Sequence, residues 1–239
     1  MIMRNKRRND LAVLGLAMLI SVQCFAQGVD PAKFAEIQKG NSQALKSYTW
    51  KQRFELQLKG ETKKVTVNMV RYDAQGNEQK TPLSEEPQAQ QQQQPAASGG
   101  RGSRVKAKVV ENKKEEFKEM MEGLAGLVKS YAQIPPDKLK AAMAKAEKIP
   151  GQGEMQGALG LKLANLLQDK DSLTIWIDTG TMLFRRIEIA SSYDKKPVSA
   201  TANYEQINTG PNYMAKAVLQ YPSKEVVVKI DNFDYQPTQ

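Results

Sequence analysis

Hydrophobic and polar residues alternate one by one along residues 47–59. Lysine, arginine, glutamate and glutamine occupy most of one face. The other face carries Tyr48, Trp50, Phe54, Leu56 and Leu58. A period of two is typical of a half-buried antiparallel strand with one wet face. A second strand is expected over residues 62–72, after the Gly60-Glu61 turn, with Val65, Val67 and Met69 inward; a short third one would reach Leu83.

The same alternation returns in the last third of the chain. Residues 172–179 and 182–191 are expected to form a hairpin around Gly180. A second hairpin is expected from residues 197–207 and 213–221, and residues 225–235 would close the chain. These lengths and spacings favour one antiparallel meander.

Between these strand regions the hydrophobic period changes to steps of three and four. This stripe comprises Phe117, Met120, Met121, Leu124, Leu127, Val128 and Tyr131, and it predicts an amphipathic helix. A second helix is expected after Pro135-Pro136, carrying Leu139 and Met143, and a looser segment over residues 155–167 completes an expected helical insert over residues 112–168. An earlier helix is expected to begin at Asp30-Pro31, since Asp can cap free amides and Pro suits the first helical turn.

The segment over residues 84–104 has low complexity and includes the run QAQQQQQPAASGGRGSR. Its Gln, Pro, Gly and Ser content buries too little apolar area to offset the entropy of ordering, which predicts a disordered loop. The Arg/Gly portion is also typical of RNA-binding tails, but in an exported chain a linker is the better interpretation.

Taken in order, these elements predict an α+β fold. We expect a curled antiparallel sheet, an open half-barrel, covered on its concave side by the N-terminal helix and the central helical insert. Residues 27–239 would then form a single half-barrel domain.

The first 26 residues have the pattern of a secretory signal peptide. A basic cluster precedes an apolar run, Leu11 to Val22, that is shorter than the roughly 20 residues a membrane-spanning helix needs. Cys24 and Ala26 suit the −3 and −1 positions of a cleavage site, which predicts cleavage after Ala26 and a periplasmic protein. Lipidation at Cys24 and a buried helix in a cytoplasmic protein are the alternatives.

Composition narrows the chemistry. The chain has no histidine, which excludes Ser-His and Cys-His catalysis and His-containing zinc sites. Cys24 is the only cysteine and leaves with the signal, so no disulfide stabilises the mature fold. We expect no enzyme, no cofactor and no metal, although a hydrolase that uses carboxylates alone stays open.

Net charge bears on partners rather than on fold. It falls from +9 to +6 on cleavage, because the first 26 residues carry four basic residues and one acidic residue. A basic surface favours peripheral contact with anionic membrane, and export makes nucleic acid an unexpected partner.

The segment SLTIWIDTGTMLFRRIEIASSYDKKPVSATANYEQI resembles the C-terminal strands of the superfamily of periplasmic lipoprotein carriers and outer-membrane lipoprotein receptors (LolA/LolB-like half-barrels). The matching residues are Trp176, Asp178, Arg185, Arg186 and Tyr193. More of the chain resembles a set of uncharacterised secreted bacterial proteins with the same SLT-x-WID hairpin. The resemblance implies an open half-barrel that can receive an acyl chain. The basic-Pro motif of the lipoprotein carriers has no counterpart in residues 48–72, and the glutamine-rich insert is foreign to them.

A lipid or other apolar ligand would be bound by inward strand residues, adaptable methionines on the helices and an arginine at the rim. These candidates are Trp50, Phe54, Leu56, Val65, Val67, Met69, Met120, Met121, Met143 and Arg185. The alternative is that the apolar residues only pack against the helices and that the arginines lie on a solvated strand face. Since Arg185 and Arg186 are adjacent in a strand, we expect them to point to opposite sides.

Two functions from different classes therefore remain. The first is a half-barrel that binds a lipid or acyl chain. The second is an interaction or structural protein of the envelope, with a filled core and a protein partner.

Overall fold

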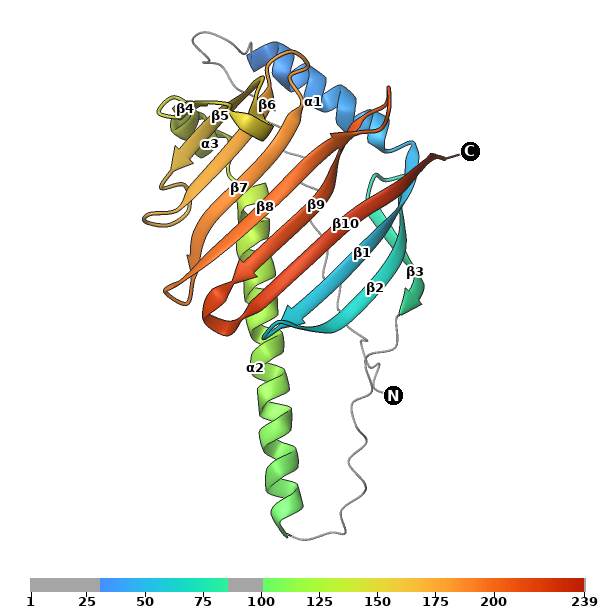
Figure 1. Ribbon diagram of the computed structural model, residues 1–239, viewed down its shortest axis with the longest axis vertical. Coiled ribbons are helices and arrows are strands. Elements are labelled where there is room, and N and C mark those ends of the chain that lie inside the picture. Colours follow the sequence, from blue (N-terminus) through green and yellow to red (C-terminus); the bar gives the residue numbers. More distant parts are fainter. Residues whose placement is uncertain (1–30, 86–100, 239) are drawn as a thin grey trace, which may run out of the picture.

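The computed structural model describes residues 31–85 and 101–238, which form one curled antiparallel sheet and three α-helices (Figure 1). The helices are α1 (Pro31–Leu45), α2 (Arg101–Ala132) and α3 (Pro136–Met143), with short 3-10 turns at Gly153–Met155 and Pro222–Lys224. The strands are β1 (Tyr48–Leu58), β2 (Glu61–Tyr72), β3 (Glu78–Glu85), β4 (Glu147–Pro150), β5 (Ala158–Ala164), β6 (Ser172–Asp178), β7 (Phe184–Tyr193), β8 (Lys196–Gln206), β9 (Asn212–Tyr221) and β10 (Val226–Pro237).

The strand order is β3-β2-β1-β10-β9-β8-β7-β6-β5-β4, and every neighbouring pair is antiparallel. The chain thus runs as a meander from β4 to β10, and β1 joins the free side of β10 with Phe54 opposite Ile230. The edge strands β3 and β4 do not pair with each other, so the sheet stays open. The predicted α+β half-barrel and C-terminal meander are confirmed.

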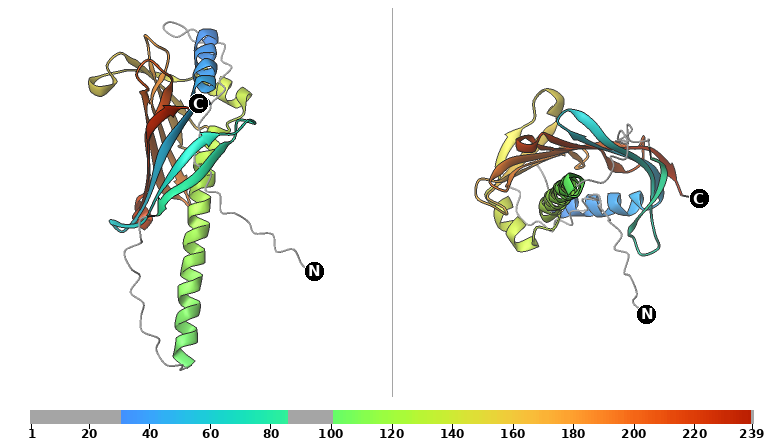
Figure 2. Two further views of the ribbon diagram at one scale, coloured as in Figure 1. Left: turned by 90° about the vertical axis from the view of Figure 1, so that its right-hand side faces the viewer. Right: turned by 90° about the horizontal axis from the view of Figure 1, so that it is seen from below.

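The helices lie inside the curl of the sheet. Seen from one end, α1 and α2 occupy the concave side of the arc (Figure 2, right). The C-terminal part of α2 runs along the strands, whereas its N-terminal part projects beyond them (Figure 1). The predicted stripe on α2 is confirmed: Met121, Leu124, Val128 and Tyr131 are its buried residues, at steps of three and four.

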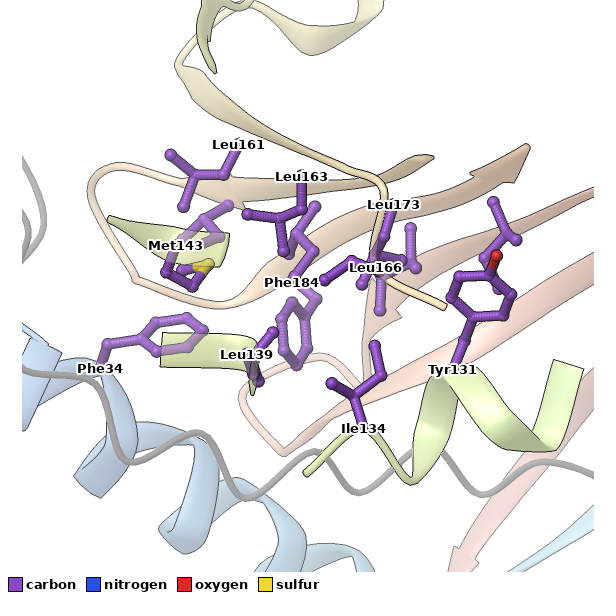
Figure 3. Packing of buried hydrophobic residues seen from close by; sticks show 14 of the residues in the cluster. Phe34, Tyr131, Ile134, Leu139, Met143, Leu161, Leu163, Leu166, Leu173 and Phe184 are labelled. Atoms are coloured by element: carbon purple, nitrogen blue, oxygen red, sulfur yellow. The ribbon is translucent and has the colours of Figure 1, made fainter. Parts of the chain in front are cut away.

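Two apolar clusters fill the contacts between helices and sheet. The larger joins α1, the end of α2 and α3 to β5–β7, and Figure 3 shows Phe34, Leu139 and Met143 facing leucines of β5 and Phe184 of β7. The smaller joins the middle of α2 to β1, β8, β9 and β10. Its buried members are Leu56, Met121, Leu124, Val198, Tyr221 and Val226.

The expected helical insert over residues 112–168 is wrong beyond Met143. Glu147–Pro150 and Ala158–Ala164 are strands, and β5 pairs with β6 with Leu161 opposite Ile175. Leu161 and Leu163 are buried while Lys162 between them is exposed, which is the strand period of two. A leucine-rich segment of this length satisfies both periods loosely, and pairing with β6 decides between them.

The low-complexity segment also differs from its expected bounds. Residues 84–85 belong to β3 and residues 101–104 to α2, so the expected disordered loop over residues 84–104 is wrong at both ends. The stretch 86–100 and the expected signal peptide, residues 1–26, lie outside the described residues. Within the described ranges, no helix combines the length and the apolar character needed to cross a membrane.

Candidate functional site: an apolar cavity beneath α2

A cavity of about 110 Å³ lies between α2 and the concave face of the sheet. One wall is formed by Met121, Leu124, Ala125 and Val128 of α2. The opposite wall spans five neighbouring strands, and its members are Phe54, Ile187, Ile189, Ala200, Thr201, Ala202, Tyr204, Met214, Ala217, Val218, Leu219, Val228 and Ile230. Almost all of these side chains are apolar, so the cavity suits an apolar guest better than water.

The cavity exists because the middle of the sheet carries alanines where its flanks carry larger residues. Ala202 of β8 lies directly opposite Ala217 of β9, and Ala200 lies one step along the same face. Towards β7, Ala202 and Ala200 face Ile187 and Ile189, and Ala125 stands on the helix above. Small side chains on both walls leave space that the neighbouring leucines and isoleucines would otherwise fill.

Tyr204 carries the polar group of the cavity wall. Thr201 also borders the cavity, but it lies between Ala200 and Ala202 on β8, so its side chain points to the other face of the sheet. The Tyr204 ring packs against Phe184, with ring centroids 5.5 Å apart. Burial raises the pKa of the Tyr204 hydroxyl, so this group stays protonated at neutral pH.

Hydrogen bonds fix α1 across one end of the concave face. Gln38 Nε2 donates to the carbonyl of Met182 at 2.8 Å. Asn41 donates from Nδ2 to the carbonyl of Asn212 at 2.8 Å and accepts the amide N–H of Asn212 at 2.6 Å. Because Asn41 satisfies both backbone groups of Asn212, α1 is held in one position against the start of β9.

A buried carboxylate fixes the C-terminal end of α2. The hydroxyl of Tyr131 donates to Asp171 Oδ2 at 2.6 Å, and Asp171 also accepts the amide N–H groups of Leu166, Leu167 and Gln168 at 2.6 to 2.8 Å. Burial acts to raise the pKa of Asp171, but these hydrogen bonds outweigh it and hold the pKa below its ordinary value. The ionised Asp171 carboxylate is therefore held by backbone amides of its own loop, which connects β5 to β6.

A polar network continues the concave face beyond the cavity. Asn232 Oδ1 accepts hydrogen bonds from Gln52 Nε2 at 2.8 Å and from Trp50 Nε1 at 3.2 Å, and Lys80 donates to Gln52 Oε1 at 2.8 Å. Burial lowers the pKa of Lys80 and raises that of Glu78, while the ion pair between them, 3.8 Å long, opposes both shifts. These groups satisfy one another, so the network rigidifies β1, β3 and β10.

The structure places two of the predicted ligand-binding residues in the cavity wall, Phe54 and Met121. Leu56 and Met120 belong to the adjacent apolar cluster. Trp50 lies in the polar network, where its ring stacks on Tyr235 at 5.3 Å. Met143 packs in the larger cluster with Phe34 and Leu139.

The expectation that Val65, Val67 and Met69 point inward is wrong. They lie opposite Glu55, Arg53 and Lys51, and residues directly opposite in an antiparallel pair share a face. Phe54, which lines the cavity, lies instead opposite Thr66. The apolar row of β2 is therefore on the convex side, because its alternation is out of phase with that of β1.

The expectation that Arg185 and Arg186 point to opposite sides is also wrong. The register of β6 and β7 shifts between Trp176 and Ile177, which inserts one extra residue into β7. Both guanidinium groups consequently reach Glu154: Arg185 donates to its carbonyl at 3.2 Å and Arg186 to its carboxylate at 3.2 Å. Arg185 thus braces the Gly153–Met155 turn and does not line the cavity.

The residues that carry the sequence resemblance have structural roles in the β6–β7 hairpin. Asp178 Oδ1 accepts the amide N–H groups of Gly180 and Thr181 at 3.0 and 2.9 Å, which closes the turn. The ring of Trp176 lies against Gly160 of β5, where a Cβ would stand only 2.9 Å from it. The motif therefore builds the sheet that supports the cavity.

Sequence reasoning missed most of the cavity wall. Ala200, Ala202 and Tyr204 were visible as the alternating face of one strand, and Leu124 and Val128 as part of the helical stripe. These residues come together only through the register of β8 with β9 and the position of α2 over both strands. Within residues 31–85 and 101–238 no group of three or more acidic or cysteine side chains is placed to hold a metal ion.

Fold and cavity together define a half-barrel with an apolar cavity under a helix. Two solved structures are similar to the chain. One is a DUF1329 family protein from Desulfovibrio piger, with 11% identity, a TM-score of 0.42 and coverage of 87% of this chain and 94% of that one. The other is a LolA superfamily protein from Nitrosomonas europaea, with 8% identity, a TM-score of 0.32 and coverage of 85% and 93%. No protein-family model and no curated protein sequence matches the chain.

Proposed function

We propose that this chain is a periplasmic binding protein that holds an acyl chain in the cavity beneath α2. The observation that carries the proposal is the alanine floor, because Ala200, Ala202 and Ala217 leave an apolar space that α2 covers but does not fill. An empty apolar cavity costs stability, roughly 24 cal/mol for each Å³. A chain that retains such a space gains most if a guest occupies it.

The cavity volume sets the scale of the guest. A cavity of about 150 Å³ in a protein core stays dry and binds benzene, so 110 Å³ holds only a short stretch of hydrocarbon. A longer chain then requires α2 to move away from the sheet or the end of the chain to leave the cavity. This favours a slender acyl chain over a bulky ring system.

The decisive experiment is native mass spectrometry of the protein purified from the periplasm without detergent, before and after organic extraction. We expect adducts of lipid mass that disappear on extraction. The same spectra give the N-terminus, expected at Gln27. A mass free of adducts would refute the proposal and favour the envelope interaction protein with a filled core.

A cavity-filling variant locates the ligand. Ala202→Leu adds three carbons at the centre of the floor, so we expect the adducts to be lost while thermal stability is kept or raised. Ala190→Leu is the matched control, because Ala190 lies on β7 next to Ile189 and is exposed. Equal adducts in wild type and Ala202→Leu would place the ligand elsewhere.

A further inference from the structure

The Tyr204 hydroxyl is a polar group without a partner in an apolar site. Among the described residues it makes no hydrogen bond, whereas Tyr131, Tyr213 and Tyr221 each make one through their hydroxyls. The hydroxyls of Tyr48, Tyr72, Tyr193 and Tyr235 also make none there, but among these tyrosines Tyr204 is the one that lines the apolar cavity. Within the described ranges, Trp176 Nε1 is the one fully buried side-chain nitrogen or oxygen atom without a hydrogen-bond partner. The Tyr204 hydroxyl is therefore not fully buried. Polar groups in protein interiors are generally paired, and an exception requires a physical explanation.

The position of Tyr204 on β8 shows at which end of the cavity its hydroxyl lies. Ala200, Ala202 and Tyr204 follow one another on the cavity face of β8, with Tyr204 last. Its ring continues a row of aromatic contacts, Phe34 to Phe184 at 5.6 Å and Phe184 to Tyr204 at 5.5 Å, that leads to α1. Tyr204 therefore stands at the α1 end of the cavity, held by packing.

Solvent reaches Tyr204, which is half-buried, but the apolar walls beside it offer a water molecule few further polar partners. A buried water molecule needs two to four polar partners. Here the neighbouring walls supply Met214, Ala217 and Ile187, and the Thr201 side chain points to the opposite face. A water at this place would have the Tyr204 hydroxyl as its polar contact, whereas a ligand oxygen arrives with its chain already placed in the cavity.

We propose that Tyr204 is a ligand-binding residue whose hydroxyl donates a hydrogen bond to the carbonyl or carboxylate oxygen of an acyl group bound beneath α2. The inference rests on the proposed function and sharpens it, because it assigns an orientation. The oxygenated end of the chain lies towards α1, and the hydrocarbon extends past Ala202 towards Leu219 and Val228. A protonated phenol donates, and the oxygen of an acyl group accepts.

The test compares three probes of equal chain length, decanoic acid, methyl decanoate and decane, by displacement of a fluorescent naphthalene sulfonate from the full-length mature protein. In Tyr204→Phe we expect affinity for the oxygenated probes to fall about 5- to 10-fold, the loss typical of one net hydrogen bond. Decane should bind within about twofold of wild type, since the ring and the cavity shape are unchanged.

Tyr213→Phe is the matched control. It also removes one hydroxyl, which bonds Glu205 at 3.4 Å, and Tyr213 is not part of the cavity wall. Its affinities for all three probes should equal those of wild type. Thermal unfolding of both variants confirms that each is folded.

The outcomes separate the inference from the function beneath it. A loss for both oxygenated probes supports an acyl ester or acid, and a loss for the acid alone supports a free fatty acid. Equal affinities in wild type and Tyr204→Phe, or an equal loss for decane, overturn the role of Tyr204 while leaving the binding function intact. If none of the three probes binds wild type, the proposed function itself fails.

Discussion

At the residue scale, Asp171 is a buried polar side chain that ties the C-terminal end of α2 to the sheet. It is 2% exposed, and it accepts one side-chain and three backbone hydrogen bonds. Tyr131, its partner on α2, is fully buried, and its oxygen also accepts a hydrogen bond from the Ser191 hydroxyl at 2.9 Å. Asp171 and Tyr131 together thus link α2, the β5–β6 loop and β7, and they fix the end of the helix that forms one wall of the cavity.

Replacing this carboxylate should destabilise the protein in a pH-dependent way. For Asp171→Asn we expect a loss of about 1–3 kcal/mol in the free energy of unfolding at pH 7, because donors in a buried site lose a charged acceptor. The pKa of Asp171 is held below its ordinary value. Its contribution is therefore complete above about pH 4 and is lost as pH falls through the folded-state pKa.

Urea unfolding at pH 7 and near pH 3 measures this difference. Asp169→Asn is the control, since Asp169 lies in the same loop and is exposed, and we expect it to change stability by less than about 0.5 kcal/mol. A destabilisation of Asp171→Asn that stays constant across this range would show that the charge itself contributes nothing.

At the element scale, two of the glycines of α2, Gly123 and Gly126, have opposite surroundings. A Cβ on Gly123 would stand 2.2 Å from the hydroxyl of Tyr193, whereas a Cβ on Gly126 meets nothing within 4 Å. Tyr193 in turn packs edge-on against Tyr221 at 5.9 Å. At Gly123 α2 therefore packs directly against the Tyr193 side chain of β7, and Gly126 lies on the exposed side of the helix.

Two alanine substitutions should therefore act in opposite directions. Alanine in a helix is favoured over glycine by about 0.5–1 kcal/mol, so Gly126→Ala should raise the free energy of unfolding by that amount. Gly123→Ala should lower it by about 1–3 kcal/mol, the usual cost of overpacking. Chemical unfolding of the pair measures both. Stabilisation by Gly123→Ala would mean that α2 sits farther from Tyr193 than described.

Helices and strands could be predicted from the sequence wherever one hydrophobic period, that of a strand or that of a helix, dominated. The alternation of β1 and the stripe of α2 gave both elements correctly, because one face of each is buried and the other is wet. The helix expected over the β5 segment is wrong, since Leu159, Leu161 and Leu163 alternate as in a strand, while Leu166 and Leu167 after the strand extend the run at spacings that also fit a helix. Alternation also states which residues share a face but not which face is concave, so Val65, Val67 and Met69 were placed on the wrong side.

The candidate site was less predictable than the elements, for a physical reason. A cavity forms where side chains are small. In the sequence, alanines such as Ala202 and Ala217 give only a weak signal for a strand and none for a cavity. Their effect appears when the register of β8 and β9 sets them opposite each other beneath Ala125. Of the proposed ligand contacts, Phe54 and Met121 were therefore found and Tyr204 was not.

At the scale of the whole molecule, the sheet is the rigid part and α2 is the element that we expect to move. α2 is held at its C-terminal end by Tyr131, while its N-terminal part projects past the strands (Figure 1). Along the cavity it offers one buried stripe, and its outer residues Glu122, Lys129 and Ser130 are exposed. Elements with few buried contacts open at lower free energy than core strands.

Ligand binding should accordingly change hydrogen exchange mainly in α2. Without ligand, we expect the amides of residues 118–128 to exchange faster than those of β6 and β7, whose buried residues Leu173, Ile175 and Ile187 lie at the centre of the larger cluster. Decanoic acid should slow exchange in residues 118–128 and leave β6 unchanged, because an occupied cavity gives the helix new contacts. In Ala202→Leu, where the added side chain takes the place of the ligand, α2 should be protected from the start and should not respond to decanoic acid. Slower exchange spread evenly over the sheet would instead mean that the ligand stabilises the fold as a whole. In that case α2 would be a fixed wall of the cavity that does not open to admit the ligand.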